Sequence, residues 1–123
     1  MILNGKAKEE FEKWILNNPQ GHESQRMIKI YNQKELFISY ISIGKTFLNA
    51  LIIDWFDSVG IYISTPSFND TVLGYQRGHE CEVYDEKNNI VYKIYNDNDV
   101  FNTRQEATEK AIDKANLIFN SYE

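Results

Sequence analysis

The most apolar stretch of the chain runs from Ser42 to Ile63. Its apolar residues recur at intervals of four and three, which is helical spacing, and additional apolar positions widen the stripe beyond one ordinary helix face. We therefore expect a central helix that is buried on more than one side. Asp57 and Ser58 interrupt the pattern, and Gly60 permits a turn into a strand over Ile61–Thr65, where apolar positions alternate. The helical stripe consists of Phe37, Ile41, Gly44, Leu48, Leu51 and Trp55, widened by Phe47, Ile52 and Phe56.

Amphipathic patterns at both ends of the chain predict two more helices. The first follows Asn4, a candidate N-cap, and ends at Asn17-Asn18 before Pro19. The last opens with Thr103 and Glu106, which have the T-x-x-E spacing of a capping box. The first stripe is Ala7, Phe11, Trp14 and Ile15, and the last is Ala107, Ala111, Ala115, Ile118 and Tyr122, widened by Ile112 and Phe119.

The segments between these helices contain two strand-like runs. Glu80–Asp85 and Ile90–Asn96 alternate with period two, and the turn 86–89 joins them as a hairpin. The pattern over residues 27–41 fits a strand or a helix, and we favour a helix over Lys34–Tyr40 with a break near 42–44. The segment 66–79 is predicted to be irregular. Sequential antiparallel strands between helices predict an α+β fold. It has a three-stranded antiparallel meander, a buried central helix, a C-terminal helix packed on the sheet and an N-terminal helix.

Size and composition indicate one globular domain covering residues 1–123. The 123 residues are 42% hydrophobic and 25% charged, which is typical of a folded domain. No apolar run is long enough to cross a bilayer, and the N-terminus lacks the pattern of a secretory signal. The single cysteine, Cys81, fits a reducing compartment. We therefore expect a cytoplasmic protein without a membrane span.

The charge balance bears on the class of partner. The formal net charge is −5, and nine acids stand against four bases between Glu80 and Asp113. Proteins that bind nucleic acid neutralise phosphates with Lys and Arg, so this balance disfavours a nucleic-acid partner. The acidic segment is either a solvated surface or a surface that matches a basic partner.

The candidate chemistry is sparse. On a strand, His79 and Cys81 would point to one side while Glu80 and Glu82 point to the other, so these four cannot close on one metal ion. Cys81 is better explained as a small core residue. The run 96–99 lacks the glycine and the closing glutamate of a calcium loop. No phosphate-binding loop or nucleophile motif is present. The sequence thus predicts no catalytic residue, no metal site, no cofactor and no enzymatic activity.

The outer face of the predicted sheet is the candidate site. If the apolar strand positions face the helices, tyrosines interspersed with charges line the opposite face, a composition typical of recognition surfaces. The alternatives are that Phe11, Trp14 and Ile15 of the first helix cover this face, or that it pairs with a second copy of the chain as a homodimer. The inward set is Val59, Ile61, Ile63, Cys81, Val83, Ile90, Tyr92 and Ile94. The predicted partner-binding residues are Tyr62, Glu82, Tyr84, Lys93 and Tyr95, with Val91 beside them.

Three patches carry a resemblance to a protein group. NGKAKEEFEKW at 4–14, IIDWFDSVGI at 52–61 and TRQEATEKAIDKANLIFN at 103–120 resemble short uncharacterised proteins of Bacteroidetes and of their phages and mobile elements. Members tend to have a proline before the central helix, where this chain has Gly44. The resemblance implies a setting of mobile or phage DNA and no known activity. It suggests a small non-enzymatic intracellular binding protein that acts on a host or phage protein, for example by inhibiting a host defence component.

The element order offers a second hypothesis. Helix, three strands and helix is also the order of double-stranded RNA-binding domains, so the alternative function is a nucleic-acid-associated accessory module. Those domains need a lysine cluster at the start of the last helix. The corresponding place here is Thr103-Arg104-Gln105-Glu106, with one base and one acid. The charge pattern therefore disfavours this alternative.

Overall fold

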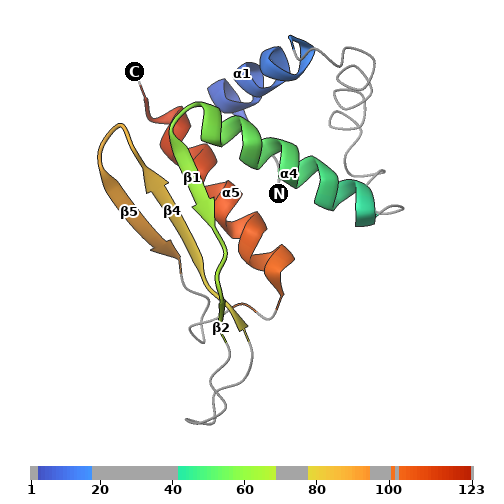
Figure 1. The fold of residues 1–123 in the computed structure, drawn as a ribbon. Coiled ribbons are helices and arrows are strands. Elements are labelled where there is room, and N and C mark those ends of the chain that lie inside the picture. The colour runs from blue at the N-terminus through green and yellow to red at the C-terminus, as the bar shows by residue number, and fades with distance from the viewer. Residues whose placement is uncertain (1–2, 18–41, 69–77, 95–100, 102, 123) are drawn as a thin grey trace.

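The computed structural model describes residues 3–17, 42–68, 78–94, 101 and 103–122 (Figure 1). The predicted helix over Lys34–Tyr40, with the rest of 27–41, and the predicted site residue Tyr95 lie outside these ranges. The helices are α1 (Gly5–Leu16), α4 (Ser42–Ser58) and α5 (Arg104–Asn120). The strands are β1 (Ile61–Ser64), β2 (Ser67–Phe68), β3 (Gly78–His79), β4 (Cys81–Asp85) and β5 (Ile90–Ile94).

The main sheet is an antiparallel meander with the order β1-β4-β5. The turn between β4 and β5 contains Asn89, whose φ of 54° lies in the left-handed region that asparagine tolerates. Gly60, with a φ of 83°, makes the turn from α4 into β1. These elements confirm the predicted α+β class and three-stranded sheet.

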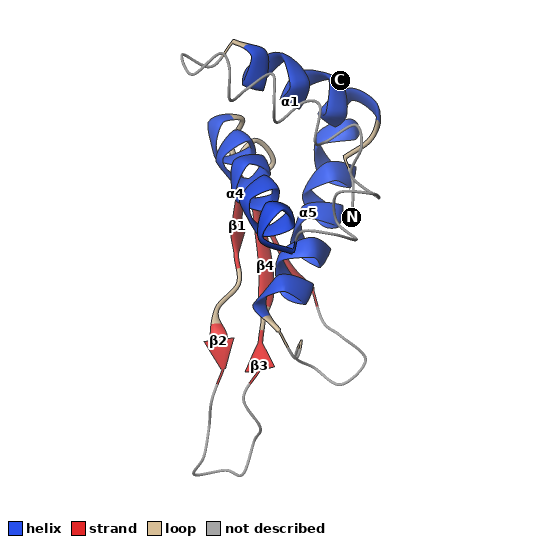
Figure 2. Ribbon diagram, turned by 90° about the vertical axis from the view of Figure 1, so that its right-hand side faces the viewer, coloured by secondary structure: helices blue, strands red, loops and turns tan. Residues whose placement is uncertain are grey.

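A small ribbon formed by β2 and β3 extends from the end of the sheet and was not predicted (Figure 2). Each strand has two residues, too few to show a period-two pattern. Backbone hydrogen bonds join the ribbon to the sheet and to Phe101: Glu80 donates to Pro66 over 2.8 Å, and His79 and Phe101 exchange two bonds of 2.8 Å. The interpretation of 66–79 as irregular is therefore wrong at these four residues.

All three described helices lie on one side of the sheet (Figures 1 and 2). Helix α5 packs against β1 and β4, and its three stripe alanines are completely buried, so its backbone approaches the strands closely. Thr103 occupies the predicted N-cap position of α5, where its hydroxyl accepts a hydrogen bond of 3.1 Å from the Glu106 N–H. Among the described helices, none combines the length and apolar character needed to cross a membrane.

Helix α4 is central, as predicted, and packs against β1, α5 and α1. Its Trp55 is 2% exposed, and the ring lies 4.9 Å from that of Phe119 and 5.9 Å from that of Phe11. The opposite side of α4, with Ala50 and Asp54, is exposed, so α4 buries one broad face and not several sides. The helix already includes Ser42, so the break predicted near 42–44 is wrong.

Helix α1 is joined to α5 by an asparagine cluster. The Asn120 side chain accepts a hydrogen bond of 2.8 Å from the Ala7 N–H and thereby caps α1 from another helix. The Asn4 side chain, which was expected to cap α1, makes no capping bond and instead accepts bonds of 2.9 Å from Asn116 and from Asn120. Asn4 does occupy the predicted N-cap position, and Gly5 follows it with a φ of 58°.

The inner face of the sheet largely follows the prediction. Ile61, Cys81 and Val83 are buried, and the remaining members of the predicted set pack at the edge of the core, except for Ile90. Ile90 is 42% exposed because it lies at the hairpin end of the sheet. Its cross-strand neighbour Asp85 is completely buried, a position that the apolar pattern did not indicate.

Candidate functional site

The predicted site residues form two rows across the outer face of the sheet. Register places Tyr62 of β1 opposite Tyr84 of β4, and Tyr84 opposite Val91 of β5. We call Tyr62, Tyr84 and Val91 the aromatic row. In the neighbouring row, Glu82 lies opposite Lys93. The structure thus brings together four of the five predicted residues, Tyr62, Glu82, Tyr84 and Lys93; the fifth, Tyr95, lies outside the described ranges.

The two outer members of the aromatic row are exposed, Tyr84 between them is half-buried, and local contacts order the two rings. Tyr62 is 41% exposed and Val91 57% exposed. The rings of Tyr62 and Tyr84 stack with centroids 6.1 Å apart and an interplanar angle of 20°. This geometry is that of an offset aromatic pair, which holds both rings in one orientation.

The tyrosine hydroxyls are held by the hairpin turn. The Tyr62 hydroxyl donates to Glu86 Oε2 over 3.2 Å, and the Tyr84 hydroxyl donates to Asn89 Oδ1 over 3.0 Å. The hydrogen bond to Glu86 raises the pKa of Tyr62, and the negative charge of Glu86 adds to this effect. Glu86 and Asn89 were not predicted as part of the site. Their place in the turn that follows Tyr84 was the available signal, since turn side chains can reach the end of a strand.

The charged row is a salt bridge across two strands. Lys93 Nζ lies 3.6 Å from Glu82 Oε1, and the side chains are 57% and 33% exposed. A pair exposed to this extent contributes about 0.2–1 kcal/mol to stability. The two charges are partly neutralised by each other, which leaves the aromatic row as the main feature of this face.

Helix α1 does not cover the outer face. Its Phe11 and Ile15 are buried, and the helix packs against α5 and α4 on the opposite side of the sheet. Trp14 stacks on Phe11 with ring centroids 6.4 Å apart. The alternative in which the first helix buries the tyrosines is therefore wrong.

A buried carboxylate anchors the hairpin that carries this face. Asp85 accepts hydrogen bonds from the Tyr122 hydroxyl and, over 2.7 Å, from the Asn88 side-chain amide. Burial alone would raise the pKa of Asp85, but the hydrogen bonds from Tyr122 and Asn88 outweigh it and lower the pKa. Burial and the contact with Asp85 also raise the pKa of Tyr122. Lys87 Nζ lies over the Tyr122 ring, 4.4 Å from its centroid. The hairpin turn is thus fixed to the end of α5.

The cysteine of the chain lies in the hydrophobic core. Cys81 is 1% exposed, and burial raises the pKa of its thiol to about 12, so the thiolate is scarce at neutral pH. This placement confirms Cys81 as a core residue. Within the described ranges, no group of three or more His, Cys, Asp or Glu side chains is arranged to hold a metal ion.

Comparison of the chain with protein families, with curated proteins and with solved structures found no match.

Proposed function

We propose that this protein is a non-enzymatic binding module that recognises a segment of a partner protein through the outer face of its sheet. The observation that carries the proposal is the partly exposed, ordered aromatic row on a face that no described helix covers. Tyrosine buries a large amphipathic surface at low conformational cost, and here the ring orientation is set before binding. Such preorganisation favours recognition by these residues.

The size of the face indicates a short segment as the bound element. Three strands of four or five residues cover roughly 15 Å by 15 Å, from the rise per residue and the spacing between strands. A stable interface between globular proteins buries about 800 Å² on each partner. The face is smaller, so we expect it to bind a peptide-like segment or to form part of a larger contact.

The charges near the aromatic row favour a basic segment. The carboxylates of Glu86 and Asp57 lie close enough to Tyr62 to raise its pKa. Burial raises the pKa of Asp57, and the neighbouring negative charge of Asp54 adds to this effect. A Lys or Arg of the partner could stack on an exposed tyrosine ring and pair with these carboxylates. The net charge of −5 also attracts a basic segment at longer range.

The biological setting is a further part of the proposal. The resemblance of three sequence patches to proteins of Bacteroidetes phages and mobile elements supports a host or phage protein as the partner, and inhibition of a host defence component is one concrete form. The alternative, a nucleic-acid-associated module, shares the element order but lacks the basic residues that such binding needs. A homodimer through the aromatic row is the other alternative.

Substitutions in the aromatic row test the proposed function. Tyr62→Ala and Tyr84→Ala should leave the fold largely intact and weaken binding of the partner about 30-fold each, which corresponds to roughly 2 kcal/mol for a central aromatic anchor. Leu117→Ala is the matched control, because Leu117 is 64% exposed on α5 and lies outside the face. The measurement is quantitative capture from the host by each variant, followed by titration calorimetry with the captured protein.

Three results would contradict the proposal. One is equal capture by wild type and both tyrosine variants. Another is a loss of stability in Tyr84→Ala comparable to that of a core substitution. The third is a wild-type dimer in light scattering that Tyr84→Arg converts to a monomer, because the face would then be occupied by a second copy. Deletion of α1 is not a useful test, since Phe11 and Ile15 belong to the core.

A further inference from the structure

Strand β5 forms an open edge of the main sheet. The sheet order is β1-β4-β5, and within the described ranges no strand lies beyond β5 (Figure 1). Ile90, Val91 and Lys93 are exposed along this strand, and its other two residues are half-buried. An edge strand with exposed apolar side chains can pair with a further strand. The edge of β5 is therefore a candidate contact surface for another chain.

The direction of the backbone groups of β5 follows from the hydrogen bonds beside β4. Before β4, Glu80 donates a backbone hydrogen bond of 2.8 Å to Pro66. After β4, Glu86 donates one of 3.0 Å to Gly60. Both bonds run toward the β1 side, and the residues of an antiparallel strand bond alternately to its two neighbours, so the odd-numbered residues of β4 bond to β5. Register pairs these odd-numbered residues with Ile90, Tyr92 and Ile94.

The other two residues of β5 direct their backbone groups out of the sheet. Val91 and Lys93 alternate with the residues that bond to β4, so their N–H and C=O groups point away from β4 at the open edge. In an antiparallel pair, a residue placed opposite such a position exchanges two hydrogen bonds with it. An added antiparallel strand would therefore be held by the backbone of Val91 and Lys93.

Lysines flank this edge on both faces of the sheet. On the outer face, the Lys93 side chain is 57% exposed, and its Nζ lies 3.6 Å from Glu82 Oε1. On the inner face, Lys114 Nζ of α5 lies over the Tyr92 ring, 4.5 Å from its centroid. Strand β5 itself contains no acidic residue. Because opposite charges stabilise cross-strand pairs, the edge favours an added strand with a carboxylate on each face.

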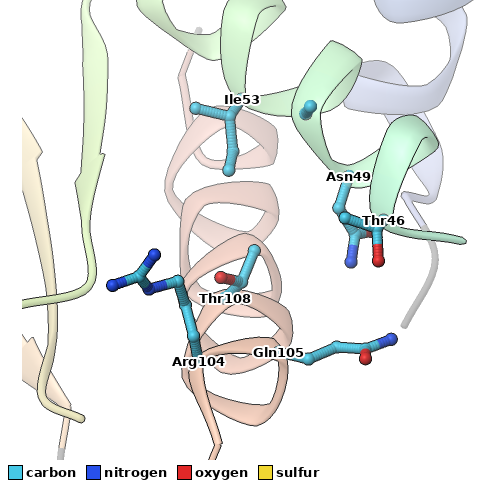
Figure 3. A pocket seen from close by; sticks show the side chains of 7 residues that line it. Thr46, Asn49, Ile53, Arg104, Gln105 and Thr108 are labelled. Carbon is cyan, nitrogen blue, oxygen red and sulfur yellow. The ribbon is translucent and has the colours of Figure 1, made fainter. Parts of the chain in front are cut away.

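The two flanks of α5 differ in what they offer a partner. The flank toward α4 lines a cleft of about 340 Å³ (Figure 3). The cleft is lined mainly by apolar surface, and the Arg104 guanidinium extends away from Asn49 and Gln105, so its polar groups do not converge. On the other flank, Lys114 reaches β5. The edge of β5 thus combines directed backbone groups with charge, and the cleft does not.

The same lysines disfavour a second copy of the chain at this edge. The antiparallel self-pairing that bonds every outward backbone group places Tyr92 opposite its own counterpart. Each Tyr92 ring carries a Lys114 ammonium group on the same face, so two like charges would meet there. Lysine on an edge strand is also a common protection against self-association.

We propose that β5 accepts an extended, acidic segment of a partner protein as a fourth, antiparallel strand of the sheet. The segment residues opposite Val91 and Lys93 make the backbone hydrogen bonds. A carboxylate on the outer face pairs with Lys93, and one on the inner face, opposite Tyr92, pairs with Lys114. An apolar side chain of the segment packs beside Ile90.

The local charges determine this preference. The net charge of −5 repels an acidic segment at long range, but physiological salt screens charges beyond about 8 Å, so the two lysines at the edge dominate on contact. The contact uses main-chain groups at one edge of the sheet. It therefore does not rest on the function proposed for the aromatic row.

The test uses the full chain and the peptide acetyl-Ser-Ile-Glu-Glu-Val-Ile-Ser-amide. In the antiparallel register its first glutamate lies opposite Lys93 and its second opposite Tyr92. Hydrogen exchange followed by two-dimensional ¹H–¹⁵N NMR should show the Val91 and Lys93 amides slowing about tenfold at a peptide concentration ten times Kd, because they exchange only from the free protein. The Tyr92 N–H, which faces β4, is the internal control and should change little.

Peptide variants separate backbone pairing from charge. N-methylation of the valine removes the N–H that points to Val91 and should weaken binding at least about tenfold. N-methylation of the second glutamate, whose N–H points away from β5, is the matched control and should have a much smaller effect. Replacing both glutamates with glutamine should weaken binding about fivefold.

Protein variants locate the contact. Lys93→Glu should weaken binding about tenfold, and a peptide with lysine in place of the first glutamate should bind Lys93→Glu more tightly than wild type. Lys13→Glu is the matched control, because Lys13 is an exposed lysine paired with an acid on α1. Val91→Pro removes an outward N–H and no bond to β4, so it should weaken binding and leave the fold intact. Tyr62→Ala should bind the peptide like wild type.

Each of the following results would overturn the proposal. The first is unchanged exchange of the Val91 and Lys93 amides at millimolar peptide. The second is a set of NMR shifts at Tyr62 and Tyr84 without shifts in β5, which would place the peptide on the outer face. The third is equal binding of the glutamate and glutamine peptides, or an equal effect of the two N-methyl groups. The fourth is a wild-type dimer in light scattering that Val91→Pro dissociates, because a second copy would then occupy the edge.

Discussion

At the residue scale, the buried polar side chains show where this core departs from an apolar pattern. Asp85 is completely buried, and its charge is compensated by hydrogen bonds from Tyr122 and Asn88. These bonds join the hairpin turn to Tyr122, which follows the C-cap of α5, so a single carboxylate connects the hairpin to the C-terminal end of the helix. A buried carboxylate satisfied in this way makes stability depend on pH.

Tyr122→Phe should reveal this pH dependence. The pKa of Asp85 is lowered from its usual 3.8 in the folded state, so the carboxylate stabilises the fold above the unfolded-state pKa and loses this effect as the pH falls below about 4. Removing the Tyr122 hydroxyl should raise the pKa of Asp85. The expected result is a loss of about 1.5–3 kcal/mol at neutral pH and acid unfolding that begins at higher pH.

Urea unfolding from neutral pH down to about pH 2.5 measures this effect, since the stabilisation by the Asp85 carboxylate begins to be lost as the pH falls through the unfolded-state pKa. Tyr92→Phe is the control, because it removes a hydroxyl from a half-buried tyrosine of the same face without removing a hydrogen bond to Asp85. If both variants lost stability with falling pH in the same way as wild type, the Tyr122 hydroxyl would not stabilise the charged form of Asp85.

Trp55→Ala tests the centre of the core. Trp55 contacts rings from α1, α4 and α5, so its truncation should destabilise the protein by about 3–5 kcal/mol in urea unfolding. Trp14→Ala is the control, because it is the same substitution at a half-buried ring. It should lower the free energy of unfolding clearly less than Trp55→Ala. A loss below about 1 kcal/mol for Trp55→Ala would mean that α4 is not the centre of the fold.

At the element scale, α1 is attached to α5 at its first turn by the asparagine cluster. Asn120→Ala removes the acceptor of the Ala7 N–H and two bonds to Asn4. We expect a loss of about 1–2 kcal/mol and faster amide exchange in the first turn of α1, with exchange at the centre of α5 unchanged. Asn17→Ala, at the exposed other end of α1, should have little effect. Slow exchange in α1 of Asn120→Ala would show that apolar packing alone positions this helix.

The elements with a strong periodic pattern were predictable from the sequence. The capping box and alanine stripe indicated α5, and alternation indicated β4 and β5 with nearly their observed bounds. The β2–β3 ribbon is too short to show a period. The cap of α1 and its polar contacts with α5 depend on distant residues: Asn4 and Asn116 are 112 positions apart, so no local pattern reveals their pairing.

The candidate site was predictable in part for the same reason. Period two placed Tyr62, Tyr84 and Lys93 on one face, and register then fixed which of them are neighbours. Whether that face is covered depended on where α1 packs. The sequence left this open, because an amphipathic stripe indicates that one face of a helix is buried but does not indicate which element packs against that face.

At the scale of the whole molecule, the basic side chains are dispersed and engaged. Among the described residues, Lys6, Lys87 and Lys114 lie over aromatic rings, and Lys13 and Lys93 pair with acids. With a net charge of −5, the protein should repel a phosphate backbone at long range.

Electrophoretic mobility shift with duplex RNA and duplex DNA tests this expectation at physiological salt. We expect no shift at protein concentrations up to about 100 μM, because even non-specific binders with Kd values of roughly 10⁻⁴–10⁻⁶ M depend on several phosphate contacts. Glu82→Lys with Glu86→Lys is an informative variant: it makes the outer face basic and should introduce weak, salt-sensitive binding. Sub-micromolar binding by the wild type that weakens steeply with added salt would contradict the protein-binding proposal and favour the nucleic-acid-associated alternative. Tight binding unaffected by salt would also contradict the charge argument, since it would require recognition without phosphate contacts.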